Sequence, residues 1–222
     1  MTNFTIKIVS DTVCPWCYIG KKRLDRAIDL YRKVYPGGKD DTFTISWSAF
    51  YLDPTSPRVG IPMMERIAER FGAERLQGIH ERLSAIGREE GINFSFAGRL
   101  GNTRDSHRLI QLGKTKGHEV ENRVVLELFR SYFEGEGDIT SHDTLVAAGE
   151  KAGLRAAEVR EWLASGKGGA EVDAEVLEAN IKGIHGVPNF TIQGTHVVDG
   201  AQDAQVFMAE FAKIKEAETG NA

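Results

Sequence analysis

The chain has 222 residues, of which 41% are hydrophobic and 27% are charged, and this is the composition of an ordinary globular protein. Its 28 Lys and Arg residues are outnumbered by 32 Asp and Glu residues, so the net charge of −4 gives no electrostatic reason to expect nucleic acid as a partner. The sequence contains no run of about 20 apolar residues, and we therefore expect no membrane partner.

The first part of the chain is predicted to form two strands joined by a helix. Apolar residues at every second position over residues 4–9, and again over 43–47, are typical of strands. Proline is favoured at the first position of a helix, so the Cys14-Pro15 pair predicts a helix that begins there and continues to Tyr35. Because a strand pattern starts at residue 4 with no signal-peptide pattern before it, we expect a cytoplasmic protein.

Residues 59–183 are predicted to form an all-α domain. The strand pattern disappears there, and apolar residues recur at helical spacing instead. The expected helical stretches are 63–71, 76–86, 109–112, 120–133, 145–152, 156–163 and 172–181.

The strand pattern returns near the end of the chain. Residues 189–193 and 195–198 are predicted to form a β-hairpin, and a helix over 201–215 follows it. The order is therefore βαβ, a helical block, then ββα. We interpret the chain as an α/β fold in which residues 1–58 and 184–222 form one discontinuous domain and residues 59–183 are an insertion.

The only two cysteines, Cys14 and Cys17, stand in one Cys-x-x-Cys pattern, which is typical of redox or metal sites. Cys14 caps the predicted helix, where unpaired N–H groups and the helix dipole favour a thiolate, so we predict a lowered pKa for Cys14. Cys17 lies one turn further along on the same face and is expected to be less accessible. The pattern predicts that Cys14 attacks a disulfide and that Cys17 resolves the mixed disulfide, with Pro15 and Trp16 tuning the redox potential.

Zinc is the alternative use of a Cys-x-x-Cys pattern. A zinc site needs two further ligands, but the sequence has no third cysteine and no pair of histidines at ligand spacing. We therefore expect no metal and no bound cofactor.

Several motifs resemble the DsbA-like branch of the thioredoxin superfamily, close to the FrnE-type oxidoreductases. They are Cys14-Pro15-Trp16-Cys17-Tyr18-Ile19-Gly20, Trp47-x-x-Phe50-x-Leu52-Asp53-Pro54, Asn102-Thr103-x-x-Ser106-His107-Arg108 and Gly186-Val187-Pro188-Asn189-Phe190. The resemblance covers essentially the whole chain. It implies a thioredoxin-like fold with an inserted helical domain, which matches the order of elements above.

The resemblance also implies that the Val187-Pro188 peptide bond is cis and lies opposite Cys14. Cis bonds before proline cost little, and a proline that opens a strand loses no ladder hydrogen bond. The backbone of Val187 would then be available to pair with an extended substrate.

Three further residues are candidates for substrate binding. His107, next to Arg108, suits an anionic substrate or glutathione, although both side chains also suit a solvated helix face after a cap at Asn102 or Thr103. Asn102 belongs to the same motif. His185 stands two residues before Val187 and either lies near the active site or is a solvated loop residue.

The sequence therefore predicts a cytoplasmic thiol–disulfide oxidoreductase, monomeric or homodimeric, that acts on protein or small-molecule thiols, with glutathione as a candidate redox partner. The alternative is a glutathione-dependent enzyme similar to kappa-class glutathione transferases and 2-hydroxychromene-2-carboxylate isomerases, in which a serine typically stands at the position of Cys14. Such an enzyme needs no resolving cysteine, so Cys17 favours the oxidoreductase. A non-catalytic binding module on the same fold is a third interpretation.

Overall fold

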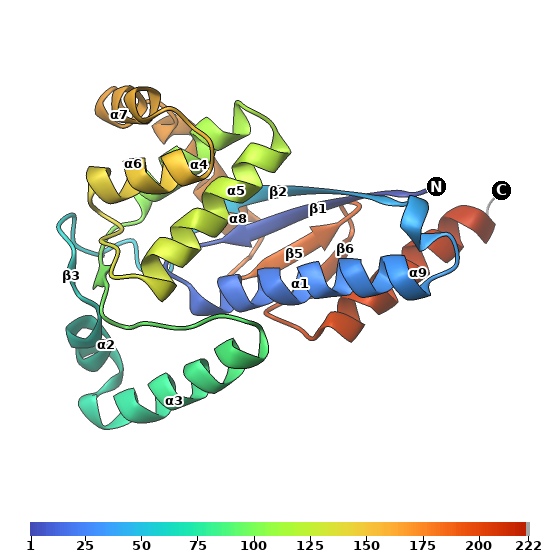
Figure 1. Cartoon of the computed structure of the whole chain (residues 1–222), viewed down its shortest axis with the longest axis horizontal. Coiled ribbons are helices and arrows are strands. Elements are labelled where there is room, and N and C mark those ends of the chain that lie inside the picture. The colour runs from blue at the N-terminus through green and yellow to red at the C-terminus, as the bar shows by residue number, and fades with distance from the viewer. Residues whose placement is uncertain (221–222) are drawn as a thin grey trace.

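The chain is described by a computed structural model that covers residues 1–220, so the last two residues of the expected 184–222 segment lie outside the described part. The fold is a mixed α/β structure with one central sheet and many helices (Figure 1). The strands of this sheet are β1 (Asn3–Ser10), β2 (Thr42–Ala49), β5 (Asn189–Ile192) and β6 (His196–Asp199).

The sheet has the strand order β2-β1-β5-β6, which joins the two ends of the chain. β1 pairs in parallel with β2, as a strand–helix–strand unit requires, with Ile8 beside Trp47. β5 pairs antiparallel with β1 and with β6, which confirms the predicted hairpin. The sheet is thus built from residues that precede and follow the helical block.

Helices cover the two faces of the sheet. Phe4 contacts Tyr31 of α1 (Pro15–Val34) and Phe211 of α9 (Ala204–Gly220), with ring centres 5.6 and 5.1 Å apart. Lys7 points to the other face because strand side chains alternate, and its Nζ lies 3.1 Å from Glu178 in the helix α8 (Gly169–Ile181). α1 begins at Pro15, as predicted from the sequence.

The predicted helices between the two halves of the sheet are confirmed. They are α2 (Met63–Phe71), α3 (Ala73–Glu89), α4 (Arg104–Lys114), α5 (His118–Phe129), α6 (His142–Lys151), α7 (Ala156–Ala164) and α8 (Gly169–Ile181). A π-helical turn, η2 (Arg130–Glu134), extends α5, and a 3₁₀ turn, η1 (Gly38–Asp40), follows α1. Ser141 caps α6 by accepting a hydrogen bond from the backbone N–H of Thr144.

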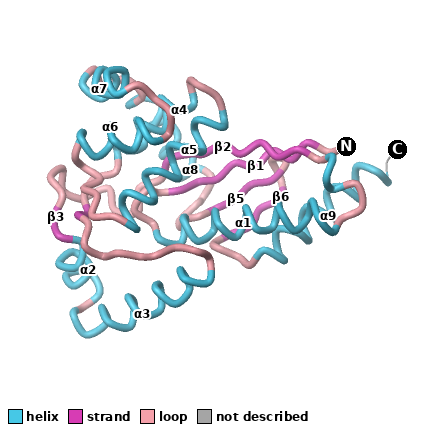
Figure 2. Tube along the Cα trace, in the orientation of Figure 1, coloured by secondary structure: helices cyan, strands magenta, loops and turns pink. Residues whose placement is uncertain are grey.

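The expectation that residues 59–183 contain no strand is wrong in one detail. β3 (Ile61–Pro62) and β4 (Arg99–Leu100) form a small antiparallel ladder, visible as the short strand segments in Figure 2. Two-residue strands carry no alternation that a sequence pattern can reveal. The Arg99 guanidinium also donates to the carbonyl oxygen of Gly60 at 2.6 Å. The ladder and this hydrogen bond hold the two ends of the α2–α3 segment together.

α2 and α3 form an arm that projects beside α1 (Figure 1). The arm is held to α1 by Glu90, directly after α3, whose carboxylate binds Arg23 at 2.8 Å and Arg26 at 2.9 Å. Only 3% of the Glu90 side chain is exposed, so the acidic partner of both ion pairs is buried between the arm and α1. The arm therefore stands next to the helix that carries both cysteines.

Candidate active site

The two cysteines lie at the start of α1, where the sequence places them. Cys14 is the N-cap residue and Pro15 the first helical residue, and the backbone N–H of Cys17 donates to the carbonyl oxygen of Cys14 at 3.1 Å. Cys14 is 3% exposed and faces a cleft, whereas Cys17 is completely buried. Both are free cysteines in this structure.

Cys17 is held as a neutral thiol by its surroundings. Burial, followed by the neighbouring Cys14 thiol, raises the pKa of Cys17 well above its ordinary value. Contacts with Ser10 and with the backbone of Asp11 act in the opposite direction but are weaker. Cys17 must therefore lose this proton inside the protein before it can act as a nucleophile.

Cys14 faces the loop before β5. The Val187–Pro188 peptide bond is cis, and the Cys14 thiol donates to the carbonyl oxygen of Val187 at 3.6 Å. Gly20 explains how α1 approaches so closely, because a Cβ atom there would lie 3.0 Å from both Pro188 and Phe190. The Cys14–Gly20 and Gly186–Phe190 motifs thus meet at one place.

A cleft of about 490 Å³ opens beside Cys14, between the start of α1, the α2–α3 arm and the loop before β5. Pro15 and Val187 line it with Cys14. Its walls are mostly apolar, and the main apolar side chains are Trp16, Leu52, Ile67, Ile79, Leu83 and Phe96.

The cleft also contains two arginines and one aspartate that the sequence did not indicate as site residues, namely Arg66, Arg82 and Asp53. Arg66 donates to Asp53 at 2.8 Å, and Arg82 lies over the indole ring of Trp16, 5.8 Å from its centre. Arg82 follows Ile79 by three residues on α3, so helical spacing places both on one face. The sequence could reveal this shared face but not that α3 turns it toward Cys14.

The interpretation of His107 and Arg108 as residues of a solvated helix face is wrong. His107 is 3% exposed, and its Nε2 lies 3.3 Å from a carboxylate oxygen of Asp11, whose other oxygen accepts from the Leu52 N–H at 2.8 Å. Arg108 donates to the carbonyl oxygen of Lys167 and to those of two further residues near it, so its guanidinium holds loops together. Helical spacing alone could not show that α4 presses this face against the rest of the protein.

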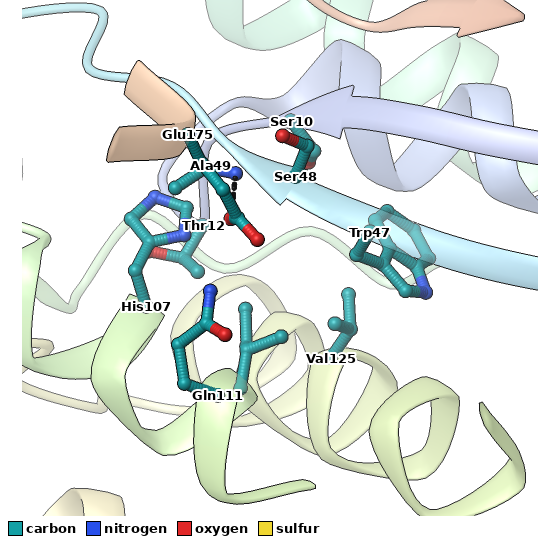
Figure 3. A pocket seen from close by; sticks show the side chains of 10 residues that line it. Ser10, Thr12, Trp47, Ser48, Ala49, His107, Gln111, Val125 and Glu175 are labelled. Carbon is teal, nitrogen blue, oxygen red and sulfur yellow. Dashed lines mark hydrogen bonds between the residues drawn. The ribbon is translucent and has the colours of Figure 1, made fainter. Parts of the chain in front are cut away.

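His107 does not line the Cys14 cleft. It borders a separate enclosed cavity of about 10 Å³, shown in Figure 3, together with Thr12, Gln111 and Glu175. A Glu175 carboxylate oxygen accepts from the backbone N–H of Ala49 at 2.8 Å at the edge of this cavity. The space suits about one water molecule and is too small for an organic substrate.

The other two substrate-binding candidates do not line the cleft either. The side-chain oxygen of Asn102 accepts from the backbone N–H of Arg104 at 3.0 Å, at the start of α4. His185 is exposed and borders a different surface hollow that also contains Val187 and Pro188. The structure therefore groups Cys14, Pro15, Trp16 and Val187 in one cleft and places Asn102 and His107 outside it, while His185 lines a neighbouring hollow that shares Val187 with the cleft.

Within residues 1–220 the structure shows no group of three or more metal-binding side chains. In the same range, none of the helices combines the length and apolar character that crossing a bilayer requires.

Residues 5–212 match the model of the DsbA-like thioredoxin domain. The chain belongs to this family. It is 28% identical over 207 residues to the uncharacterized protein YwbO of Bacillus subtilis, covering 91% of this chain and 92% of that protein. A solved structure of a probable DsbA oxidoreductase, SCO1869 of Streptomyces coelicolor, is 30% identical with a TM-score of 0.83, covering 95% of this chain and 89% of that one.

A more distant solved structure shares the fold. A 2-hydroxychromene-2-carboxylate isomerase superposes with a TM-score of 0.65 at 15% identity, covering 98% of this chain and 99% of that one. At this level of identity the similarity concerns the fold alone. The resemblance seen in the sequence motifs is confirmed at the level of the DsbA-like thioredoxin domain.

Proposed function

We propose that this member of the DsbA-like family is a thiol–disulfide oxidoreductase of a reducing, cytoplasmic compartment. The observation that supports this most strongly is the placement of the two sulfurs. Cys14 faces a cleft opposite Val187, and Cys17 lies buried one turn behind it. An exchange enzyme needs one accessible attacking sulfur and one protected sulfur within reach of it.

The reaction proceeds in two exchange steps. The Cys14 thiolate attacks a substrate disulfide, forms a mixed disulfide with one half and releases the other half as a thiolate, which takes up a proton. Cys17 then loses its proton and attacks the Cys14 sulfur, which releases the second half as a thiol and leaves a Cys14–Cys17 disulfide. The protein is oxidised by two electrons and the substrate is reduced by two. A thiol reductant, with glutathione as the first candidate, reverses these steps to restore the dithiol.

Two single variants test this mechanism. Cys14→Ser should abolish turnover of a disulfide substrate, whereas Cys17→Ser should still form the mixed disulfide but release its second half slowly. Mass spectrometry of the trapped adduct and the rate of thiol release measure the two effects. A Cys14→Ser variant that keeps full turnover would overturn the proposal, and wild-type protein that shows no turnover of any disulfide would favour a binding module.

A glutathione-dependent isomerase or transferase is the second candidate, because an isomerase shares the fold over nearly the whole chain. That reaction activates the thiol of bound glutathione and uses no resolving cysteine. Cys17→Ser separates the two functions, since an isomerase should keep its full rate with bound glutathione while an oxidoreductase should stall. Isothermal titration of reduced protein with glutathione completes the test, because the second candidate requires tight binding without a mixed disulfide.

A further inference from the structure

We propose, on the basis of the oxidoreductase function above, that the Cys14 cleft takes small organic disulfides with an apolar body and a carboxylate, and that Arg82 binds the carboxylate. The cleft volume of about 490 Å³ lies within the roughly 300–1,000 Å³ of ordinary small-molecule sites. The cleft begins at the attacking sulfur itself, so a molecule bound there presents its disulfide to Cys14.

The walls of the cleft favour an apolar body. The half-buried side chains of Trp16, Ile67 and Ile79 line it from α1, α2 and α3, and Phe96 and Leu52 contribute from loops. An apolar or aromatic ring removes this surface from water on binding, which stabilises the complex by about 25 cal/mol per Å². Glutathione, with two carboxylates and an ammonium group, offers few groups that match these walls.

Charge in the cleft favours one anionic group on the substrate. Its charged lining residues are Asp53, Arg66 and Arg82, and Glu69, which also pairs with Arg66, does not line the cleft. Arg66 is compensated by Asp53 at 2.8 Å and by Glu69 at 3.2 Å. Arg82 has no acidic partner among residues 1–220 and contacts the indole ring of Trp16 instead.

Arg82 is also well placed with respect to the reacting sulfur. Trp16, over which its guanidinium lies, stands two residues after Cys14 in the first turn of α1, and Arg82 and Cys14 line the same cleft. Arg82 is an exposed residue that also lines the cleft, so a ligand can reach it. A carboxylate pairs well with the planar fork of an arginine, and this geometry anchors one end of the substrate while its sulfur meets Cys14.

The test compares three disulfides in single-turnover reactions of the reduced protein. 5,5′-Dithiobis(2-nitrobenzoate) is aromatic and carries carboxylates, 2,2′-dithiodipyridine is aromatic and uncharged, and oxidised glutathione is polar. Arg82→Gln should slow the reaction with the dithiobis-nitrobenzoate by about threefold to fivefold, as expected for a partly exposed ion pair. The rate with dithiodipyridine should not change.

Arg88→Gln is the matched control, because Arg88 is an exposed arginine on the same helix and does not line the cleft. It removes the same charge and should leave all three rates unchanged. The apolar wall is tested by Ile79→Asn, which should slow both aromatic disulfides relative to oxidised glutathione. Far-UV circular dichroism of each variant establishes that it is folded.

Three outcomes would overturn the inference. Equal slowing by Arg82→Gln and Arg88→Gln would mean that only long-range charge matters. Equal slowing of both aromatic disulfides by Arg82→Gln would mean that Arg82 acts on Cys14 and not on a carboxylate. Faster reaction with an apolar disulfide-linked peptide, independent of Arg82, would point to a polypeptide occupant. Failure of the proposed function looks different, because wild-type protein would then release no second thiol from any of the disulfides.

Discussion

At the residue scale, the burial of Cys17 separates the two sulfurs chemically. A thiol whose pKa is raised in the folded protein stays protonated at neutral pH, so the resolving step depends on a small thiolate fraction. The rate of this step should therefore rise by about tenfold per pH unit from pH 7 to 9, since the thiolate fraction rises in this way below the pKa. Stopped-flow release of the second thiol from a preformed Cys14 mixed disulfide measures it. A pH-independent rate would contradict this role of Cys17.

The same shift has a consequence for stability. The folded state keeps the Cys17 proton where the unfolded state loses it, so this stabilisation is fully present below pH about 8.5 and falls as pH rises above it. Urea denaturation at pH 7 and pH 9 should show a smaller loss of stability in Cys17→Ser than in the wild type. An equal loss in both proteins would show that Cys17 does not contribute.

Asp11 is a second buried group with a specific structural role. One oxygen of its carboxylate accepts from the Leu52 N–H and the other lies 3.3 Å from His107, so Asp11→Asn removes a buried charge and turns one of these two acceptor oxygens into an N–H donor. We expect a loss of about 1–3 kcal/mol in the free energy of unfolding. Asp29→Asn, an exposed position on α1, is the control and should change stability by less than about 0.5 kcal/mol. Equal effects of the two variants in urea titrations would contradict this role.

The residue scale is also where sequence reasoning was least complete. Cys14, Cys17 and the Val187–Pro188 pair could be located because their chemistry depends on local spacing. Arg82 could not be located, since its role depends on the direction in which α3 faces. His107 was assigned to a solvated face or to a substrate site because helical spacing does not show which helix packs against which.

At the element scale, the approach of α1 to the loop before β5 determines how Cys14 meets Val187. Gly20→Ala places a methyl group 3.0 Å from side-chain atoms of Pro188 and Phe190, so these side chains or α1 must give way by a few tenths of an ångström. We expect a loss of about 1–3 kcal/mol in stability together with slower disulfide exchange. Gly78→Ala in α3 is the matched control, because a methyl group there meets nothing within 4 Å and should stabilise the helix by about 0.5–1 kcal/mol. Unchanged exchange in Gly20→Ala would show that this approach does not control reactivity.

The elements themselves were well predicted from the sequence. Strand alternation and the Cys14-Pro15 helix start are local signals, and the structure confirms them. The small ladder of β3 and β4 was missed because its pairing joins Ile61 to Leu100 across a whole helical pair. Non-local pairing of short segments leaves no periodic signal in the chain.

At the scale of the whole molecule, one hydrophobic cluster runs from the sheet into the helical block. Tyr18 of α1 stacks on Phe129 of α5 with ring centres 5.1 Å apart, and its hydroxyl donates to Glu134 at 2.5 Å. These contacts join the segments on either side of the predicted division at residues 58 and 184. We therefore expect the sheet and the helical block to unfold together.

Phe129→Ala tests this coupling. Removing a completely buried ring should cost about 3–5 kcal/mol and should lower the stability of both parts together. Urea transitions followed by far-UV circular dichroism and by tryptophan fluorescence should coincide in the wild type and in the variant. Two separated transitions would show instead that the helical block unfolds on its own.

The contact between Cys14 and Val187 joins residues that are 173 positions apart in the chain. Almost the entire polypeptide, including every helix of the insertion, lies between the attacking sulfur and the carbonyl oxygen that faces it. During synthesis the cysteine motif therefore emerges long before the segment that completes its surroundings, and closing so long a loop is slow. A truncated chain that ends before Val187 would therefore carry both sulfurs without the carbonyl oxygen that faces Cys14.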